Sequence, residues 1–138
     1  MAVINQLAGT HLLDLPVRNY GVSAIVEGAC VMLDTANPAT SSGAAGVVLT
    51  ASAANAIGFA VNAIPAGGSG LVRVQGIAVA NPLVGTTIAA GAPVMTNATG
   101  TIVPQTAAAA QIGYAWSAVT TAVAGDKVLV LIDRAKNA

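Results

Sequence analysis

One pattern occurs twice in this chain of 138 residues, and it limits the folds that the chain can adopt. The stretch "IGFAVNAIPAGGSG" begins at Ile57, and "IGYAWSAVTTAVAG" begins at Ile112. Both start with Ile-Gly-aromatic-Ala, end in glycine and lead into a Val-rich run, "LVRVQGI" or "DKVLVLI". A short repeated unit cannot bury its own apolar face, so we expect two related units that pack on one another.

The repeat extends upstream of both phrases. "GACVMLD" begins at Gly28 and "GAPVMTN" begins at Gly91, so Gly-Ala-x-Val-Met precedes each copy. The loop that follows is longer in the first copy, and residues 35–46 are the place where we expect the extra length. The sequence therefore predicts repeat-like β units at about residues 28–79 and 91–133.

Individual positions of the repeat have structural interpretations. Gly58 and Gly113 are interpreted as glycines that allow two strands to pack closely, because a side chain is missing there. Phe59 and Tyr114 are interpreted as anchors of the core.

Strand-forming residues dominate the chain. Val, Ile and Thr are frequent, the helix formers Lys, Glu, Arg and Gln are scarce, and Gly or Pro interrupts every short run. This pattern predicts an all-β fold, a small β-barrel or sandwich (β-tulip-like). The predicted strands are Ser23–Ile25, Cys30–Asp34, Val47–Thr50, Ile57–Ile64, Leu71–Val79, Pro93–Thr96, Thr101–Pro104, Ile112–Val119 and Lys127–Asp133.

Two details of this prediction concern particular strands. "NATG" (97–100) suits a tight hairpin in which Gly100 has a positive φ. "KVLVLID", from Lys127, is apolar on both faces, so we expect it inside a sheet and not at its edge.

The surface of this protein must be short of charge. Hydrophobic residues make up 55% of the chain and charged residues 7%, with a formal net charge of zero. An ordinary soluble domain has about 25% charged residues. We therefore expect partners or copies of the chain itself to cover much of the surface. The five basic residues are balanced by five acidic ones, which argues against nucleic acid as a partner.

The sequence gives no sign of a membrane span or a secretion signal. The charge-free window from Ile77 to Met95 is interrupted by Asn, Pro, Gly and Thr, which do not suit a helix in lipid. The first 20 residues lack the basic start and the continuous apolar core of a signal peptide. We expect synthesis in the cytoplasm and no membrane partner.

Catalytic, cofactor and metal sites are not expected. Cys30 and His11 are the one cysteine and the one histidine, and they could in principle form a nucleophilic pair. Cys30, however, alternates with Met32 in an apolar strand, where a thiol acts as a small hydrophobic group. The acids Glu27 and Asp34 flank that strand and do not form a ligand cluster. A lone cysteine also excludes an internal disulfide.

The second half of the chain resembles a known family. The segment Leu71–Asp133 is similar to the small capsid decoration, or cement, proteins of tailed bacteriophages, and "CVMLDT" (30–35) echoes a further motif of some members. Family motifs match here as "VRVQGIA", "AGAPV", a hairpin glycine, "IGYA" and "AGDKVLVLI". The matching residues are Val72, Val74, Gly76, Ile77, Ala78, Ala90, Gly91, Ala92, Val94, Gly100, Ile112, Gly113, Tyr114, Ala115, Ala124, Gly125, Asp126, Val128, Val130 and Ile132.

This resemblance implies a structural protein without catalytic residues. Such a protein binds the outer surface of the expanded capsid as a homotrimer, at three-fold or quasi-three-fold positions. There it clamps neighbouring major capsid subunits against the pressure of the packaged DNA. Its partners are then the major capsid protein and itself, and its location is the virion. A β-module of a secreted adhesin, pilus or surface array is the alternative, because such modules favour the same residues.

The first residues are predicted to form an arm. Residues 1–19 precede the first copy of the repeat, no counterpart is evident before the second copy, and residues 20–138 form the single β domain. Because Pro16 does not suit a central strand, we expect an extended segment that pairs with a sheet edge of a capsid subunit or a neighbouring protomer. An edge strand on the chain's own core is the alternative. The residues expected at this interface are Val3, Ile4, Leu7, His11, Leu12, Leu13, Leu15 and Arg18.

Overall fold

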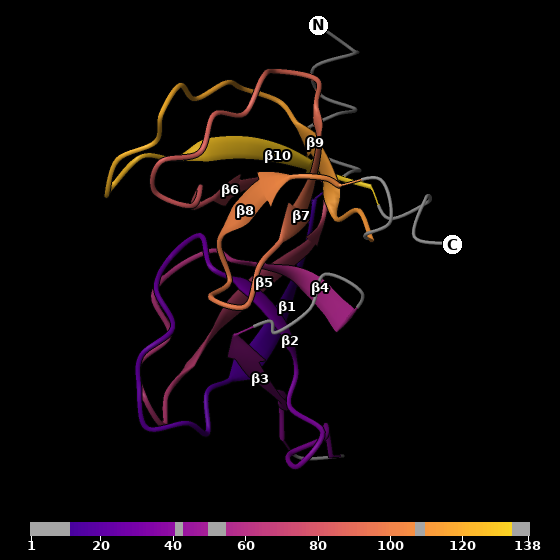
Figure 1. The fold of residues 1–138 in the computed structure, drawn as a ribbon. Helices are drawn as coiled ribbons and strands as arrows, with labels where there is room; N and C mark the ends of the chain where they lie inside the picture. Colours follow the sequence, from indigo (N-terminus) through magenta and orange to yellow (C-terminus); the bar gives the residue numbers. More distant parts are fainter. Residues whose placement is uncertain (1–11, 41–42, 50–54, 107–109, 134–138) are drawn as a thin grey trace, which may run out of the picture.

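The described part of the chain is built from β-strands. The structure, a computed structural model, describes residues 12–40, 43–49, 55–106 and 110–133. These residues form strands, bridges and turns without an α-helix, which confirms the all-β prediction (Figure 1). It follows that none of them belongs to a helix able to cross a bilayer.

The strands form two groups that follow one another along the chain (Figure 1). The first group consists of β1 (Leu13–Arg18), β2 (Cys30–Leu33), β3 (Ala45–Leu49), β4 (Ala56–Ala60) and β5 (Ser69–Gln75). The second group consists of β6 (Ile77–Ala80), β7 (Pro93–Thr96), β8 (Ile102–Pro104), β9 (Gly113–Ala115) and β10 (Val128–Ile132). The first group closes into a barrel in the order β1-β3-β2-β4-β5, and the second is a five-stranded sheet in the order β6-β10-β9-β7-β8.

Both groups follow the same pairing scheme. β1 runs antiparallel to β5, with Val17 opposite Gly70, and β6 runs antiparallel to β10, with Ala80 opposite Val128. The pairs β2–β3 and β2–β4 correspond in the same way to β7–β8 and β7–β9. β1 also pairs in parallel with β3, and the corresponding contact in the second group is the parallel bridge between Pro82 and Ile102. The chain therefore contains two equivalent units, the first unit (β1–β5) and the second unit (β6–β10).

The predicted limits of the units need correction at their starts. β1 is the counterpart of β6, so each unit begins one strand earlier than the repeated motifs indicated, and the Leu13–Arg18 part of the predicted arm does have a counterpart before the second copy. The sequences "LDLPVR" and "IAVA" share no pattern of side chains. Only the register of their partner strands shows the equivalence.

The predicted strand Leu71–Val79 is wrong as a single element. The chain leaves β5 and starts β6 at Gly76, whose φ of 97° is favourable for glycine and rare for other residues. Other strands are shorter than predicted. Residues 23–25 contribute only the bridge of Ile25 with Ile64, and the predicted end of Ile112–Val119 is the bridge of Val119 with Ile88.

Other strand predictions are confirmed. Pro93–Thr96 is β7 as predicted, and β10 lies inside the second sheet, between β6 and β9. The β7–β8 hairpin turns through Asn97–Gly100, where Gly100 has a φ of 76°. Gly58 and Gly113 also have the predicted role, because a Cβ atom on either would collide with a carbonyl group of the facing strand.

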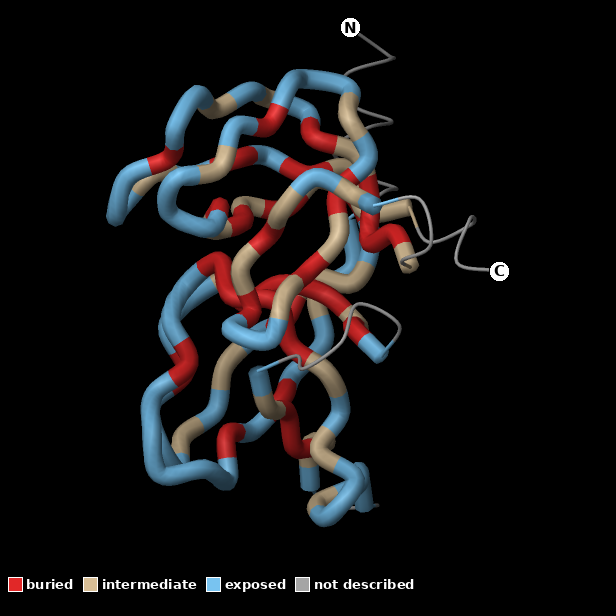
Figure 2. The backbone as a smooth tube through the Cα atoms, in the orientation of Figure 1, coloured by how far each residue is buried: buried red, intermediate tan, exposed pale blue. Residues whose placement is uncertain are grey.

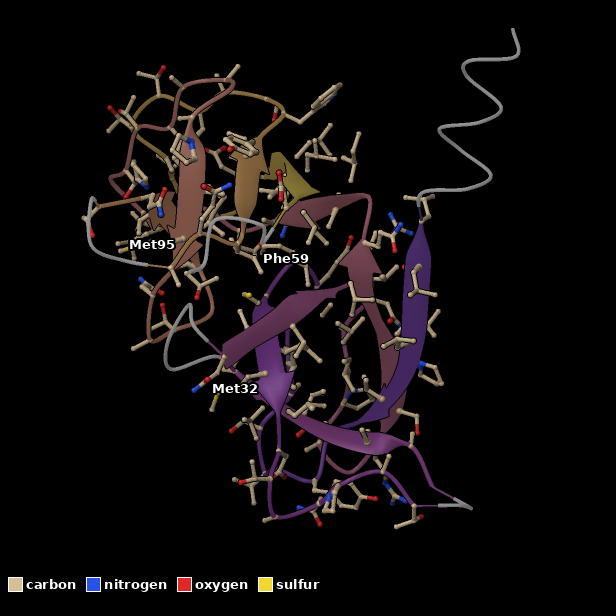
Figure 3. The ribbon with its side chains drawn as sticks, turned by 90° about the vertical axis from the view of Figure 1, so that its right-hand side faces the viewer. Met32, Phe59 and Met95 are labelled. Atoms are coloured by element: carbon tan, nitrogen blue, oxygen red, sulfur yellow. The ribbon has the colours of Figure 1, made fainter. Side chains whose placement is uncertain are left out.

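The larger of the two core clusters lies where the two units meet. One cluster of buried side chains lies inside the first barrel and includes Val17, Val31 and Val72. The other joins Cys30, Ala56 and Phe59 of the first unit to the buried residues of the second unit. Phe59 is fully buried and lies between the two groups of strands (Figure 3), and buried stretches of both units run through this junction (Figure 2). Phe59 is therefore a core anchor that holds the two units together.

Tyr114 is not a core anchor, in contrast to the prediction. It occupies in β9 the register position that Phe59 occupies in β4: Phe59 lies opposite Arg73, and Tyr114 lies opposite Leu131. Tyr114 is only half-buried, because nothing in the described part of the chain covers it as the second unit covers Phe59.

Candidate functional site

The interface residues predicted in the arm fall into two sets. Val3, Ile4, Leu7 and His11 lie outside the described residues. Leu12 directly precedes β1, Leu13 and Leu15 lie in its first half, and the three are exposed by 45%, 46% and 40%. Arg18 ends β1 and is also exposed, and its guanidinium lies 5.1 Å from the centre of the Tyr20 ring, within the range of a cation–π contact.

The part of the arm that forms β1 is bound to its own barrel. β5 pairs with it from Leu13 to Arg18, and β3 pairs with Val17 and Arg18. Pro16 is accommodated because β3 reaches only the last two residues of the strand, which leaves β1 with one neighbour at Pro16. Leu13–Arg18 is therefore a strand of the barrel, and the pairing of its other edge, at Leu13–Pro16, with a sheet edge of another protein stays a prediction. The alternative, a strand on the chain's own core, is what the structure has.

An ion pair on the outer surface of the barrel joins β1 to β5. The Arg73 Nε donates to Asp14 Oδ1 over 2.8 Å, and its Nη2 donates to Asp14 Oδ2 over 3.0 Å. The third nitrogen, Nη1, donates to the carbonyl oxygen of Ile77 over 3.0 Å. Arg73 therefore connects β1 to β5 and also to the first residue of β6. This paired geometry is the stronger form of a carboxylate–guanidinium contact.

The ion pair predicts a stability that depends on pH. The hydrogen bond from Arg73 lowers the pKa of Asp14, the guanidinium charge acts in the same direction, and partial burial opposes both. The pair therefore stabilises the fold above the ordinary pKa of Asp, about 4, and this contribution is lost as the pH falls through the lowered value. We expect Asp14→Asn to cost about 1 kcal/mol or less at pH 7, because both side chains remain partly in water.

Urea unfolding of the wild type and Asp14→Asn at a series of pH values measures this effect. The difference in the free energy of unfolding should be present at pH 7 and disappear in strong acid. An equal difference at pH 7 and in strong acid would show that the ion pair is not its cause.

A second set of polar contacts fixes the units to each other. The side-chain amide of Asn81 donates to the carbonyl oxygen of Glu27 over 2.8 Å, and the Lys127 ammonium donates to the Asn81 side-chain oxygen. The amide nitrogen of Cys30 donates to the carbonyl oxygen of Gly100 over 2.8 Å, which attaches the β7–β8 hairpin to β2. Together with Phe59, these contacts hold the exposed residues of both units in one fixed arrangement.

Cys30 has the surroundings of a structural residue. It is fully buried in β2 and packs in the same cluster as Phe59, as expected for a thiol in an apolar strand. His11 lies outside the described residues. Within the described ranges, no group of three or more His, Cys, Asp or Glu residues is placed to hold a metal ion.

Three exposed valines in loops were not predicted from the sequence as candidate contact residues. Val84 and Val123 are exposed by 62% and 60% in neighbouring loops, which are joined where Gly85 donates its amide to the carbonyl oxygen of Ala122. Val22 is exposed by 98% in the loop after β1. In the sequence, these valines stand among the Gly, Thr and Ser residues of predicted loops. An apolar residue in such a segment is the signal that could have predicted its exposure.

Comparison with known proteins identifies the family. Residues 32–132 match the family model described as phage cement protein. No curated protein matches the sequence. Among solved structures, the crystal structure of the N base of the head fiber gp8.5 of bacteriophage phi29 superposes with a TM-score of 0.64 at 18% sequence identity, covering 89% of this chain and 95% of that one. The likeness to that structure concerns the fold.

The family match spans strands of both units, from β2 in the first unit to β10 in the second. It includes Phe59 and the junction that this residue makes between the units. The chain therefore belongs to the phage cement protein family.

Proposed function

We propose that the protein is a decoration protein that binds the outside of the expanded capsid and stabilises it by clamping neighbouring major capsid subunits. The family match over residues 32–132 carries this proposal. In the proposed virion, three copies form a homotrimer at a three-fold or quasi-three-fold position. The protein is made in the host cytoplasm and joins the head after expansion.

The exposed chemistry of the chain supports a role in binding other proteins. Charged residues make up only 7% of the sequence, and large aliphatic side chains are exposed on β1 and in the loops of both units. Charged residues are depleted at the centre of protein interfaces, whereas an ordinary free surface is rich in them.

The attachment element of this proposal is the segment before β1 together with the first residues of the strand. Val3, Ile4, Leu7 and His11 precede the barrel, and Leu12, Leu13 and Leu15 continue the apolar series to its surface. Arg18 marks the end of the same strand. Because β1 is fixed in the barrel, the segment before it leaves the first unit from a defined place, and its aliphatic side chains contact the capsid.

Deletion of residues 1–11 tests this element. The deletion leaves β1–β10 intact, whereas removal of residues through Asn19 would open the barrel by taking β1 away. We expect the shortened protein to unfold within a few degrees of the full-length melting temperature and to lose at least tenfold in affinity for expanded, DNA-filled heads. Co-sedimentation of protein with heads over a range of concentrations measures the affinity.

Two results would contradict parts of this proposal in different ways. Full affinity of the shortened protein would show that another surface attaches the protein to the head. Failure of the full-length protein to co-sediment with the heads on which it is expected would contradict the decoration function itself. A variant with Ala98→Ser, which changes a small exposed side chain in the turn between β7 and β8, serves as the control for nonspecific loss of binding.

A further inference from the structure

Each unit carries a pair of loops that are joined to each other by backbone hydrogen bonds. In the first unit, Ile25 in the loop after β1 and Ile64 in the loop after β4 exchange two such bonds, of 2.9 and 2.8 Å. In the second unit, Ile88 in the loop after β6 and Val119 in the loop after β9 do the same over 2.9 Å. Both pairs of loops lie on the left of Figure 1, and their outer stretches are exposed (Figure 2). The two units therefore present equivalent loops on the same side of the molecule.

The ends of both loop pairs are apolar. The turns that lead into β5 and β10 begin at Pro65 and Val123, whose carbonyl oxygens accept the closing hydrogen bonds of 2.8 and 3.1 Å. Both residues are exposed. In the loops beside these turns, Val22 is exposed by 98% and Val84 by 62%. We call Val22 and Pro65 the first tip, and Val84 and Val123 the second tip.

Hydrogen bonds within the chain fix the first tip. The buried Asn19 donates its backbone amide to the carbonyl oxygen of Gly68 over 2.8 Å. Its side-chain amide donates to the carbonyl oxygen of Ser23 over 2.8 Å. The loop that bears Val22 is thereby attached to the turn that begins at Pro65.

The second tip is fixed by a short ladder of hydrogen bonds. Gly85 donates its amide to the carbonyl oxygen of Ala122 over 2.7 Å, and Ala122 donates its own amide to the carbonyl oxygen of Thr86 over 2.8 Å. Thr121 has a φ of 44°, which is rare for a β-branched residue, and the Thr87 hydroxyl accepts its amide over 2.9 Å. Strain of this kind is concentrated at functional sites, where the surrounding structure holds it in place.

The chemistry of the tips suits an uncharged protein surface. The loops after β4 and β6 contain no charged residue. The carboxylate of Asp126, in the loop after β9, accepts the amide of Val123 over 2.9 Å and so belongs to the turn itself. Apolar groups that are already fixed lose little conformational freedom on binding, and charged residues are depleted at the centre of protein interfaces.

We propose that the two tips are the contacts through which one chain bridges two neighbouring copies of the major capsid subunit, one copy at each tip. The inference rests on the proposed function, in which clamping requires contacts with at least two subunits, whereas the N-terminal segment leaves the first unit at one place. Equivalent contacts on two equivalent units suit a partner that is itself present as identical neighbouring copies. For a member of the cement family, the capsid lattice is that partner.

Two aspartate variants and a matched control test the tips. Val22→Asp places a charge on the first tip, and Val84→Asp places one on the second. Ala98→Asp introduces the same side chain in the exposed turn between β7 and β8 and is the control. Thermal melting shows whether each variant is folded, and co-sedimentation with expanded, DNA-filled heads measures the affinity. Val22→Ser and Val84→Ser replace any aspartate variant of a tip that does not fold.

We expect each tip variant to melt within a few degrees of the wild type and to bind heads about tenfold more weakly or worse, because linked contacts strengthen one another. Ala98→Asp should keep the wild-type affinity. Where a tip variant saturates the heads, the temperature at which they release DNA should stay that of undecorated heads, because a chain with one intact tip holds a single subunit.

Three results would overturn the inference: wild-type affinity in a folded tip variant, an equal loss of affinity in Ala98→Asp, or a release temperature raised as far by a saturating tip variant as by the wild type. In each of them the wild type still binds the heads, so the decoration function stands. Failure of the wild type to bind contradicts that function instead.

Discussion

Replacement of Phe59 by alanine is expected to lower the free energy of unfolding by about 3–5 kcal/mol, the usual cost of deleting a buried aromatic ring. Phe59 is fully buried and packs against the buried residues of the second unit. The deletion removes the transfer free energy of the ring and leaves a cavity at the junction. The resulting loss therefore reports on how much the two units depend on each other.

Urea unfolding monitored by circular dichroism measures this loss, with Tyr20→Ala as the control. Tyr20 is also aromatic but is exposed by 44%, so its replacement should cost about 1 kcal/mol or less. If the two variants lost the same stability, the junction would not depend on Phe59. If Phe59→Ala unfolded in two separate transitions, each unit would be stable without the other.

Replacement of Gly58 by alanine is expected to cost about 3 kcal/mol or more, because the new methyl group overfills a site that cannot relax easily. A Cβ atom on Gly58 would collide with the carbonyl oxygen of Arg73, which belongs to the backbone of β5. β4 and β5 would have to separate, and this pair is part of the closed barrel. Gly113→Ala should have the same effect, through the carbonyl oxygen of Leu131.

Gly125→Ala is the matched control for these two variants. Gly125 has a φ of 93° and open space where its Cβ would lie, so the substitution brings backbone strain of about 1–2 kcal/mol without a collision. Thermal melting of the three variants compares the two causes. If Gly58→Ala and Gly113→Ala melted at the same temperature as Gly125→Ala, close strand packing would not be the reason for the repeated glycine.

The repeated motifs made the central part of each unit predictable. Gly58, Gly113 and Gly100 have the roles that the sequence indicated, because each depends on contacts or turns within a few residues or a facing strand. The all-β fold followed from the scarcity of helix formers. Cys30 was correctly placed in a buried strand because it alternates with other apolar residues.

The arrangement of the units could not be predicted from these motifs. The sequence predicts an arm at β1, because Pro16 and an irregular apolar pattern do not indicate a strand. The partner strand lies more than 50 residues away along the chain. The difference between Phe59 and Tyr114 was also hidden. The two residues stand in the same motif, and only the packing of the second unit on the first buries one of them and leaves the other half-exposed.

The proposed clamping of capsid subunits is tested most directly by the temperature at which expanded heads release their DNA. Heads stripped of decoration protein are heated with increasing amounts of the protein, and a DNA-binding dye reports the release. We expect the release temperature to rise and to reach a plateau when a fixed number of copies is bound per head. Saturated binding with an unchanged release temperature would contradict stabilisation of the capsid by this protein.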